Sequence, residues 1–287
     1  MHDLLFFLKA CVASKTLITS LCGLLIIPLA AWILVRLLAP FIRRMDADAA
    51  WQAPLAAIAA AMPGSVFLLL AIIDLGGAYS SGCLQFLWGR MLFAGILSMT
   101  VLAFARATTI TYQRVVHIRT LVALSHEPAQ SVLSIAQRVG VQVRVLPFPD
   151  PFCALARIIH PVVLVSRGTL ERLNAEELEA ALRHELAHLL RADLPLSAAF
   201  SFFAELLPLS TGDLISTYAI AREFAADQHA TRKIEAHHLA SAIISLAGTQ
   251  KIANSVAALA EDSATIKPRV VALLEERART ASPLGRR

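Results

Sequence analysis

Charged residues are scarce in this sequence. Asp, Glu, Lys and Arg make up only 16% of its 287 residues, whereas soluble globular domains carry about 25%. Hydrophobic residues reach 57%, and the mean hydropathy is +0.64. This composition argues against an ordinary water-soluble domain and indicates that part of the chain lies in a lipid bilayer.

The sequence also lacks two patterns that would indicate other kinds of site. None of the four cysteines has C-x-x-C spacing, which argues against a disulfide framework and against a thiolate metal site. The basic residues, which give a net charge of +5, are spread along the chain without an interleaved aromatic cluster. Direct binding of nucleic acid is therefore not expected.

Long uncharged runs dominate the N-terminal part. Thr16–Val35 has about twenty residues, enough to cross a hydrocarbon core of ~30 Å, and Ala53–Ile73 and Leu84–Ala105 follow it. A signal peptide is the alternative for the first run, but that run is too long and is followed by arginines instead of a small-residue cleavage site. The sequence thus predicts a membrane domain over residues 1–105 with three transmembrane helices.

The loops predict the orientation of these helices. The connection Gly76–Gln85 carries no charge, whereas arginines follow the first and third runs, at Arg43, Arg44, Arg106, Arg114 and Arg119. Positively charged loops stay in the cytoplasm. The chain is therefore predicted to be a multi-pass protein of the inner (plasma) membrane with residues 106–287 in the cytoplasm, although Lys9 and Lys15 favour the opposite orientation.

The part after Arg106 mixes charged and apolar residues and predicts a small α+β unit. Val141–Leu146 alternates in polarity, and His160–Ser166 is a β-branched run, so both read as strands. Asn174 can cap a helix, with Glu177 completing a capping box. Pro195 should end that helix soon after Asp193.

Two further helices are expected beyond that point. Leu194–Ser210 is strongly apolar, but Glu205 and two prolines make it a poor fourth span. A helix lying against the membrane or the other spans is favoured, and a spanning helix stays open. Another helix is predicted to begin near Asp213.

The central motif is His184-Glu185-Leu186-Ala187-His188. Residues four apart share one face of a helix, so both imidazoles can reach one ion. Zinc accepts imidazole nitrogens, and Glu185 can take a proton from a water that the metal activates. The alternatives are a solvated helix face or a satisfied core histidine. They are disfavoured because the inward face of this helix is otherwise apolar and buried polar groups need partners.

A third ligand for one Zn²⁺ ion has to come from elsewhere. A glycine and a third histidine downstream of the motif are excluded, because Arg191 and Leu194 stand at those positions. Glu223 and Asp227 share a face of the next helix. Glu223 can ligate the metal, and Asp227 can accept the outer N–H of a ligand histidine.

The segments 184–193 and 222–227 together resemble the membrane metallopeptidase domain of the BlaR/MecR-type antirepressor receptors. They are also similar to the wider group of prenyl-protein and heat-shock membrane zinc endopeptidases. The resemblance extends to Pro151–Ala154 and Val162–Ser166, and weakly to Arg269–Leu274.

This resemblance implies a gluzincin-like site with the pattern HExxH…ExxxD. His184, His188 and Glu223 would be the zinc ligands, Glu185 the general base and Asp227 the partner of a ligand. Asp193 matches a recurring acidic position without an assigned role. The resemblance also implies that Val162–Ser166 is an edge strand to which the substrate adds in extended form.

The overall prediction is a mainly α membrane protein with three N-terminal transmembrane helices and a small α+β metallopeptidase domain over residues 106–287. The predicted function is a membrane-bound zinc endopeptidase with a regulatory antirepressor role. Its predicted partners are a protein or peptide substrate, with a transcriptional repressor as one candidate, and membrane lipid; a homodimer stays open. The BlaR/MecR-type receptors continue with a further span and an extracellular ligand-binding domain, which this sequence does not contain. Direct antibiotic sensing by this polypeptide is therefore not expected.

Two rival interpretations remain. An intramembrane site-2-type protease would carry the motif in a spanning helix, but charged residues flank it here, at Glu176, Glu177, Glu179, Arg183 and Arg191. A catalytically inactive membrane signalling or scaffold protein with a zinc site is the other rival. Replacement of Glu185 by Gln separates it from an enzyme, because only an enzyme needs the general base.

Overall fold

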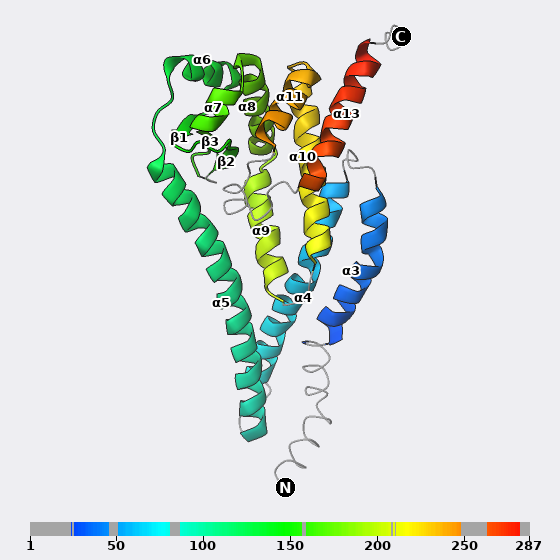
Figure 1. Ribbon diagram of the computed structural model, residues 1–287. Coiled ribbons are helices and arrows are strands. Elements are labelled where there is room, and N and C mark those ends of the chain that lie inside the picture. Colours follow the sequence, from blue (N-terminus) through cyan, green and yellow to red (C-terminus); the bar gives the residue numbers. More distant parts are fainter. Residues whose placement is uncertain are drawn as a thin grey trace. The chain divides into compact units, whose positions relative to one another are not determined.

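The computed structural model describes residues 24, 26–45, 51–80, 87–156, 159–207, 209, 211–247 and 263–281. These residues are mostly helical and include one three-stranded sheet (Figure 1). They group into two compact units that interleave along the chain. The described residues of Met1–Met45, Pro54–Tyr112 and Ala198–Ile215 form the first unit, and those of Asp46–Ala53, Gln113–Ser197 and Ser216–Arg287 form the second.

The first unit contains the long N-terminal helices. These are α3 (Ile27–Arg44), most of α4 (Gln52–Ser80) and the first part of α5 (Leu87–Leu124). By length and composition, two stretches can cross a membrane, Gln52–Gly76 in α4 and Phe93–Leu124 in α5. The predicted first span, residues 16–35, lies largely outside the described residues and stays a prediction.

Helix α5 does not end at Ala105, where the third span was predicted to end. It continues without interruption to Leu124, because residues 106–124 contain neither glycine nor proline to break it. The change in composition at Arg106 therefore lies within a helix.

Helix α9 (Asp193–Glu205) packs against α4 and α5 through its second half, which belongs to the first unit. A Cβ atom on Gly64 of α4 would lie 1.8 Å from the carbonyl oxygen of Phe203, so the two helix backbones touch at this glycine. Phe202 packs edge-to-face on Phe104 of α5 at 5.5 Å. This arrangement agrees with the expected helix against the other spans.

Pro195 does not end the preceding helix as predicted. Helix α8 already ends at Leu190, and Pro195 lies in the first turn of α9. The first turn of a helix has no internal partners for its N–H groups, so a proline costs little there.

The second unit is built on the sheet. Its strands are β1 (Val143–Leu146), β2 (Cys153–Ala156) and β3 (Val162–Ser166), in the order β1-β3-β2. Strand β1 is parallel to β3, and β2 is antiparallel to it. The prediction that Val162–Ser166 is an edge strand is therefore wrong. All five of its residues are buried, as expected for a continuous apolar run in the middle of a sheet.

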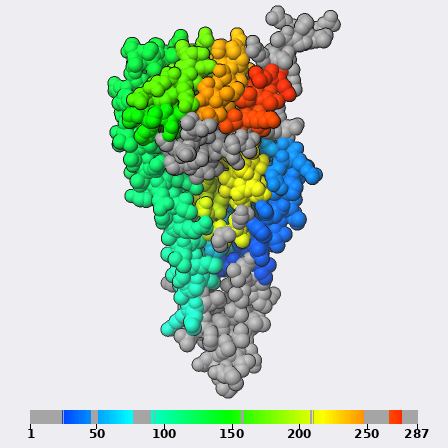
Figure 2. Space-filling view, in the orientation of Figure 1, coloured from blue at the N-terminus to red at the C-terminus, as the bar shows by residue number. Residues whose placement is uncertain are grey.

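The helices of this unit are α6 (Gln130–Val139), α7 (Arg167–Arg172), α8 (Ala175–Leu190), most of α10 (Gly212–Thr231), α11 (Ala236–Leu246) and α13 (Ser263–Ala281). Helix α7 contacts β3, α8 contacts β2, and α6 and α11 contribute to the core cluster on the sheet. Leu178 and Leu182 of α8 share a core cluster with Val163 and Val165 of β3. This packing fixes the orientation of α8. Figure 2 shows α11 (orange) and α13 (red) side by side at the surface of this unit.

The capping box predicted at the start of α8 is confirmed. Asn174 Oδ1 accepts hydrogen bonds from the amides of Glu176 and Glu177 at 3.0 and 2.9 Å. The Glu177 carboxylate accepts from the Asn174 amide at 3.0 Å. Helix α8 therefore begins at a defined residue, which sets the direction in which its later side chains point.

Candidate metal centre

Three polar side chains lie on the buried face of α8. His184, Glu185 and His188 are only 8%, 9% and 9% exposed. The two imidazoles stand edge to face with centroids 4.8 Å apart, and their Nε2 atoms are 3.1 Å apart. The i, i+4 spacing therefore brings both Nε2 atoms to one point, as the sequence predicts.

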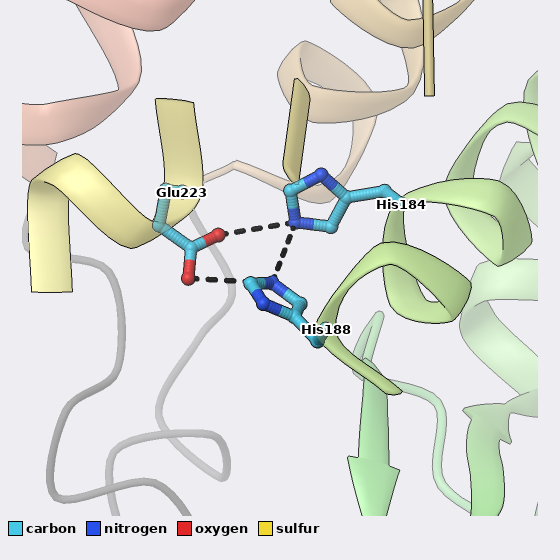
Figure 3. A group of neighbouring side chains, drawn as sticks. All are labelled: His184, His188 and Glu223. Atoms are coloured by element: carbon cyan, nitrogen blue, oxygen red, sulfur yellow. Dashed lines mark hydrogen bonds and ion pairs between the residues drawn. The ribbon is translucent and has the colours of Figure 1, made fainter. Parts of the chain in front are cut away.

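Glu223 of α10 closes this group (Figure 3). Its Oε2 lies 3.1 Å from His184 Nε2, and its Oε1 lies 3.5 Å from His188 Nε2. One ligand atom from each of the three residues lies within 4.8 Å of the others. The structure thus joins an imidazole pair to a carboxylate 39 positions away from His184 in the chain.

These separations suit a single zinc ion. Ligand atoms about 2.0–2.1 Å from a tetrahedral zinc lie about 3.3 Å from one another. The two Nε2 atoms, 3.1 Å apart, and His184 Nε2 with Glu223 Oε2, also 3.1 Å apart, come close to this value. His188 Nε2 lies nearest to the other Glu223 oxygen, Oε1, at 3.5 Å. Two imidazoles and one carboxylate are also a donor set found in catalytic zinc sites, which leave the fourth position to water or substrate.

Each imidazole has its own carboxylate on the opposite side of the ring. His184 Nδ1 lies 2.9 Å from Asp227 Oδ1, and His188 Nδ1 lies 2.8 Å from Asp193 Oδ2. A carboxylate that accepts the Nδ1 proton leaves the Nε2 lone pair free for a metal. Asp227 thus lies where the sequence predicts it.

Asp193 has a role that sequence reasoning did not assign. The chain leaves α8 through Ala192, which has a left-handed φ of 54°. This turn brings Asp193 back to His188, and Asp193 is only 4% exposed. The resemblance marked the position, but only the geometry of the turn reveals its partner.

Two arginines flank the Glu223 carboxylate. Arg222 Nη2 lies 3.0 Å from Oε1, and Arg269 Nη1 lies 3.5 Å from Oε2. Arg269, from α13, also holds Asp227 through two contacts of 2.7 Å. Both arginines lie in segments to which the resemblance extends, but the sequence analysis assigned neither a role. For Arg269 a further signal was available, because it lies among the apolar residues of one helix face, where charge is unfavourable.

The charges around the centre favour a bound cation. The carboxylates of Glu185, Asp193, Glu223 and Asp227 outnumber the guanidiniums of Arg191, Arg222 and Arg269, which leaves a formal charge of −1 when the histidines are neutral. Buried charge of one sign is strongly unfavourable unless it is compensated. A bound cation would compensate this negative charge.

The pKa values of the metal-free centre reflect the same excess of negative charge. Burial opposes protonation of His184, but hydrogen bonds to Asp227 and Glu223 and the charge of Asp227 outweigh burial and raise the pKa of His184 to about 9. Burial likewise opposes protonation of His188, whereas the charge of Glu223 and the hydrogen bond to Asp193 raise its pKa. Protons on the imidazoles therefore compensate the carboxylates when no metal is bound.

The carboxylates respond in the opposite direction. Burial would raise the pKa of Glu223, but the charge of His188 and the hydrogen bonds from both imidazoles hold it well below its ordinary value. Burial also opposes ionisation of Asp227, and the charge and hydrogen bonds of Arg269 lower its pKa. Both groups are thus anionic at neutral pH.

Glu185 lies between this centre and the sheet. Its Oε2 accepts a hydrogen bond of 2.7 Å from the amide of Leu155 in β2. Strand β2 pairs with β3 on one side only, and the Leu155 amide turns away from β3 towards Glu185. The described edge strand beside the centre is therefore β2, which the sequence did not predict because Cys-Ala-Leu-Ala lacks β-branched residues.

Comparison with known proteins gives one partial similarity to a protease. No family model matches the chain. Over 81 residues the chain is 35% identical to a protein of Moorella thermoacetica named "Protease HtpX homolog". The match covers 28% of this chain and 27% of that protein, so the chain spans about a quarter of the curated relative's length. The chain is similar, in part, to a protease.

This similarity agrees with the apolar helices. Helices α4 and α5 are long and apolar enough to cross a membrane, and together with the partial likeness to a protease they indicate a membrane protein. The similarity supports the broad group of membrane peptidases to which the sequence motifs also point. A specific relation to the BlaR/MecR-type receptors stays a prediction.

Proposed function

We propose that the chain is a membrane-bound zinc endopeptidase in which His184, His188 and Glu223 hold one Zn²⁺. The observation that carries this proposal is the convergence of three ligand atoms within 4.8 Å of one another. A carboxylate lies against the outer nitrogen of each imidazole, which is the usual arrangement around metal-ligating histidines. The partial similarity to a protease adds to it.

The residues of the centre divide the chemistry among them. When bound, zinc would lower the pKa of a water to about 7 and polarise the carbonyl of a peptide bond. Glu185 follows His184 directly on α8, and its carboxylate would take the proton from the attacking water and deliver it to the leaving amine. Asp227 and Asp193 keep the imidazoles oriented, and Arg222 contacts the Glu223 carboxylate at 3.0 Å.

A protein or peptide is the substrate class that fits the surroundings of Glu185. Strand β2 is an edge strand, and its Leu155 amide already reaches the Glu185 carboxylate. An extended peptide paired with this edge would lie beside the general base. In this proposal β2 takes the place of Val162–Ser166 as the strand that receives the substrate.

We further propose the cellular setting that the sequence predicts. Residues 1–105 form the membrane domain of a multi-pass protein of the inner membrane, and residues 106–287 form the catalytic domain on the cytoplasmic side. A regulatory antirepressor role, with a transcriptional repressor as substrate, follows from the resemblance to the receptor family. Lipid is a partner in this setting, and a homodimer stays open.

Metal analysis and peptide cleavage, measured on the full chain in detergent, test this proposal. Wild type should retain about one zinc per chain and cleave a quenched peptide library. Glu185→Gln should retain zinc and lose cleavage, whereas Glu223→Gln should lose both. Glu179→Gln is the matched control, because Glu179 lies on α8 but pairs with Arg183 and Arg138 away from the centre.

Three results would overturn the proposal. Wild type that binds no zinc under zinc-replete conditions would remove the metal centre. Cleavage at the wild-type rate by Glu185→Gln would remove the assigned general base. Zinc binding without cleavage by wild type would favour the inactive scaffold.

A further inference from the structure

A bidentate ion pair between Arg269 and Asp227 lies next to the candidate ligand His184, on the Nδ1 side of its ring. Arg269 Nε lies 2.7 Å from Asp227 Oδ2, and Nη2 lies 2.7 Å from Oδ1. Arg269 and Asp227 are only 2% and 3% exposed. Asp227 Oδ1 also faces His184 Nδ1 at 2.9 Å. Asp227 Oδ1 thus accepts a hydrogen bond from the guanidinium and lies in ion-pair contact with the imidazole.

Packing alone does not explain an arginine at this position. Arg269 lies on the same face of α13 as Ile266, Val270 and Leu273, which join a core cluster with α11. Burying a guanidinium is costly, and a hydrophobic residue of similar volume packs at least as well. The arginine at this point of an apolar face therefore indicates a task that needs its charge or its hydrogen-bonding fork.

The bidentate contact made by Nε and Nη2 of Arg269, called the fork below, has a geometric effect that a single point charge lacks. A carboxylate held by one contact can rotate about its terminal torsion, whereas two parallel N–H···O contacts fix its plane. With the plane fixed, Oδ1 of Asp227 stays opposite His184 Nδ1. The Nε2 atom of His184 then stays directed at Glu223 and His188.

We propose that Arg269 is a positioning residue of the metal centre, which acts on His184 through Asp227. This inference rests on the proposed function, since it assumes that His184 is a metal ligand. The same guanidinium extends its third nitrogen, Nη1, to 3.5 Å from Glu223 Oε2. Helix α13 therefore contributes to the centre although Arg269 is 42 positions from Asp227 in the chain.

Competitive titration of zinc against a chromogenic chelator tests this role on the full chain in detergent. Replacing a partner of a metal-ligating histidine typically weakens metal affinity 10- to 100-fold, and we expect a loss of about this size for Arg269→Gln. Arg269→Lys keeps the charge but loses the fork, so it should also bind zinc more weakly than wild type. Arg183→Gln is the matched control. This variant removes the partly buried ion pair between Arg183 and Glu179 in the same unit. It should leave zinc affinity unchanged.

A double variant shows whether Arg269 acts through Asp227. If it does, Arg269→Gln combined with Asp227→Asn should bind zinc no more weakly than Asp227→Asn alone. Additive losses would contradict the proposed route. Should Arg269→Gln not fold, Arg269→Lys carries the test, and in Arg269→Ala added millimolar guanidinium should recover part of the affinity.

The outcomes separate this inference from the proposed function. Wild type that binds no zinc overturns both. A second outcome is that wild type binds zinc and Arg269→Gln binds it equally tightly, while the metal-free variant unfolds at a lower temperature than metal-free wild type. This outcome would support the metal centre but overturn the role of Arg269. Full wild-type affinity in Arg269→Lys would also overturn it, because charge alone would then suffice.

Discussion

The Nδ1 atom of His188 lies 2.8 Å from Oδ2 of Asp193, five positions further along the chain. The contact forms because α8 ends at Leu190 and the chain turns through Ala192 in a left-handed conformation. Asp193 thus does for His188 what Asp227 does for His184. Both candidate ligands of α8 have an anionic partner that favours the tautomer with a free Nε2.

Removing this partner should weaken the metal centre. We expect Asp193→Asn to lower zinc affinity about 10- to 100-fold, because an amide no longer favours the Nδ1–H tautomer of His188. Titration against a competing chelator measures the change. Asp213→Asn, which alters the pair of Asp213 with Arg36 in the other unit, should leave affinity unchanged. Equal affinities for Asp193→Asn and wild type would exclude the assigned role.

The metal-free protein should lose stability as the pH rises. The pKa of His184 is about 9 in the folded chain and about 6.5 in an unfolded one. A raised pKa contributes stability that is fully present below pH 6.5 and is lost as the pH rises through about 9. The contribution of His184 is on the order of 3 kcal/mol, and the raised pKa of His188 adds in the same direction.

Chemical unfolding of chelator-treated protein between pH 6 and pH 9.5 checks this prediction. His184→Gln should flatten the dependence on pH. Bound zinc should reduce or reverse it, because the metal and the protons compete for the same nitrogens. Constant or rising stability of the metal-free wild type over this range would contradict the raised pKa values.

Gly64 is predicted to be essential for the packing of α4 against α9. A Cβ atom there would meet the carbonyl oxygen of Phe203 at 1.8 Å, and helix backbones cannot both stay in place. We expect Gly64→Ala to destabilise the protein by about 1–3 kcal/mol, measured as a lower midpoint of thermal unfolding in detergent.

Gly95→Ala in α5 provides the control for this substitution. No atom lies within 4 Å of a Cβ built on Gly95, so alanine should be neutral there or slightly stabilising through its higher helix propensity. If both variants unfold at the wild-type temperature, the close approach of α4 and α9 is wrong.

Local sequence signals predicted the parts of the fold that local interactions determine. The capping box of Asn174 and Glu177, the strand Val162–Ser166 and a helix beginning near Asp213 were all visible in short stretches of sequence and are confirmed. The spacing of His184 and His188 also predicted that their rings share one face of α8.

Features that depend on distant parts of the chain could not be predicted in this way. The sequence showed a buried strand at Val162–Ser166, but its place in the middle of the sheet depends on β2, whose residues carry no strand signal. The contact of Arg269 with Asp227 joins two helices. It follows from the packing of α13 and not from any local pattern.

X-ray absorption at the zinc edge, measured on the zinc-loaded wild type, tests the central claim most directly. We expect nitrogen and oxygen ligands at about 2.0–2.1 Å with the scattering pattern of two imidazoles. Glu223→Gln should lower zinc occupancy under the same loading conditions. A sulfur ligand at about 2.3 Å, fewer than two imidazoles, or no bound zinc at all would contradict it.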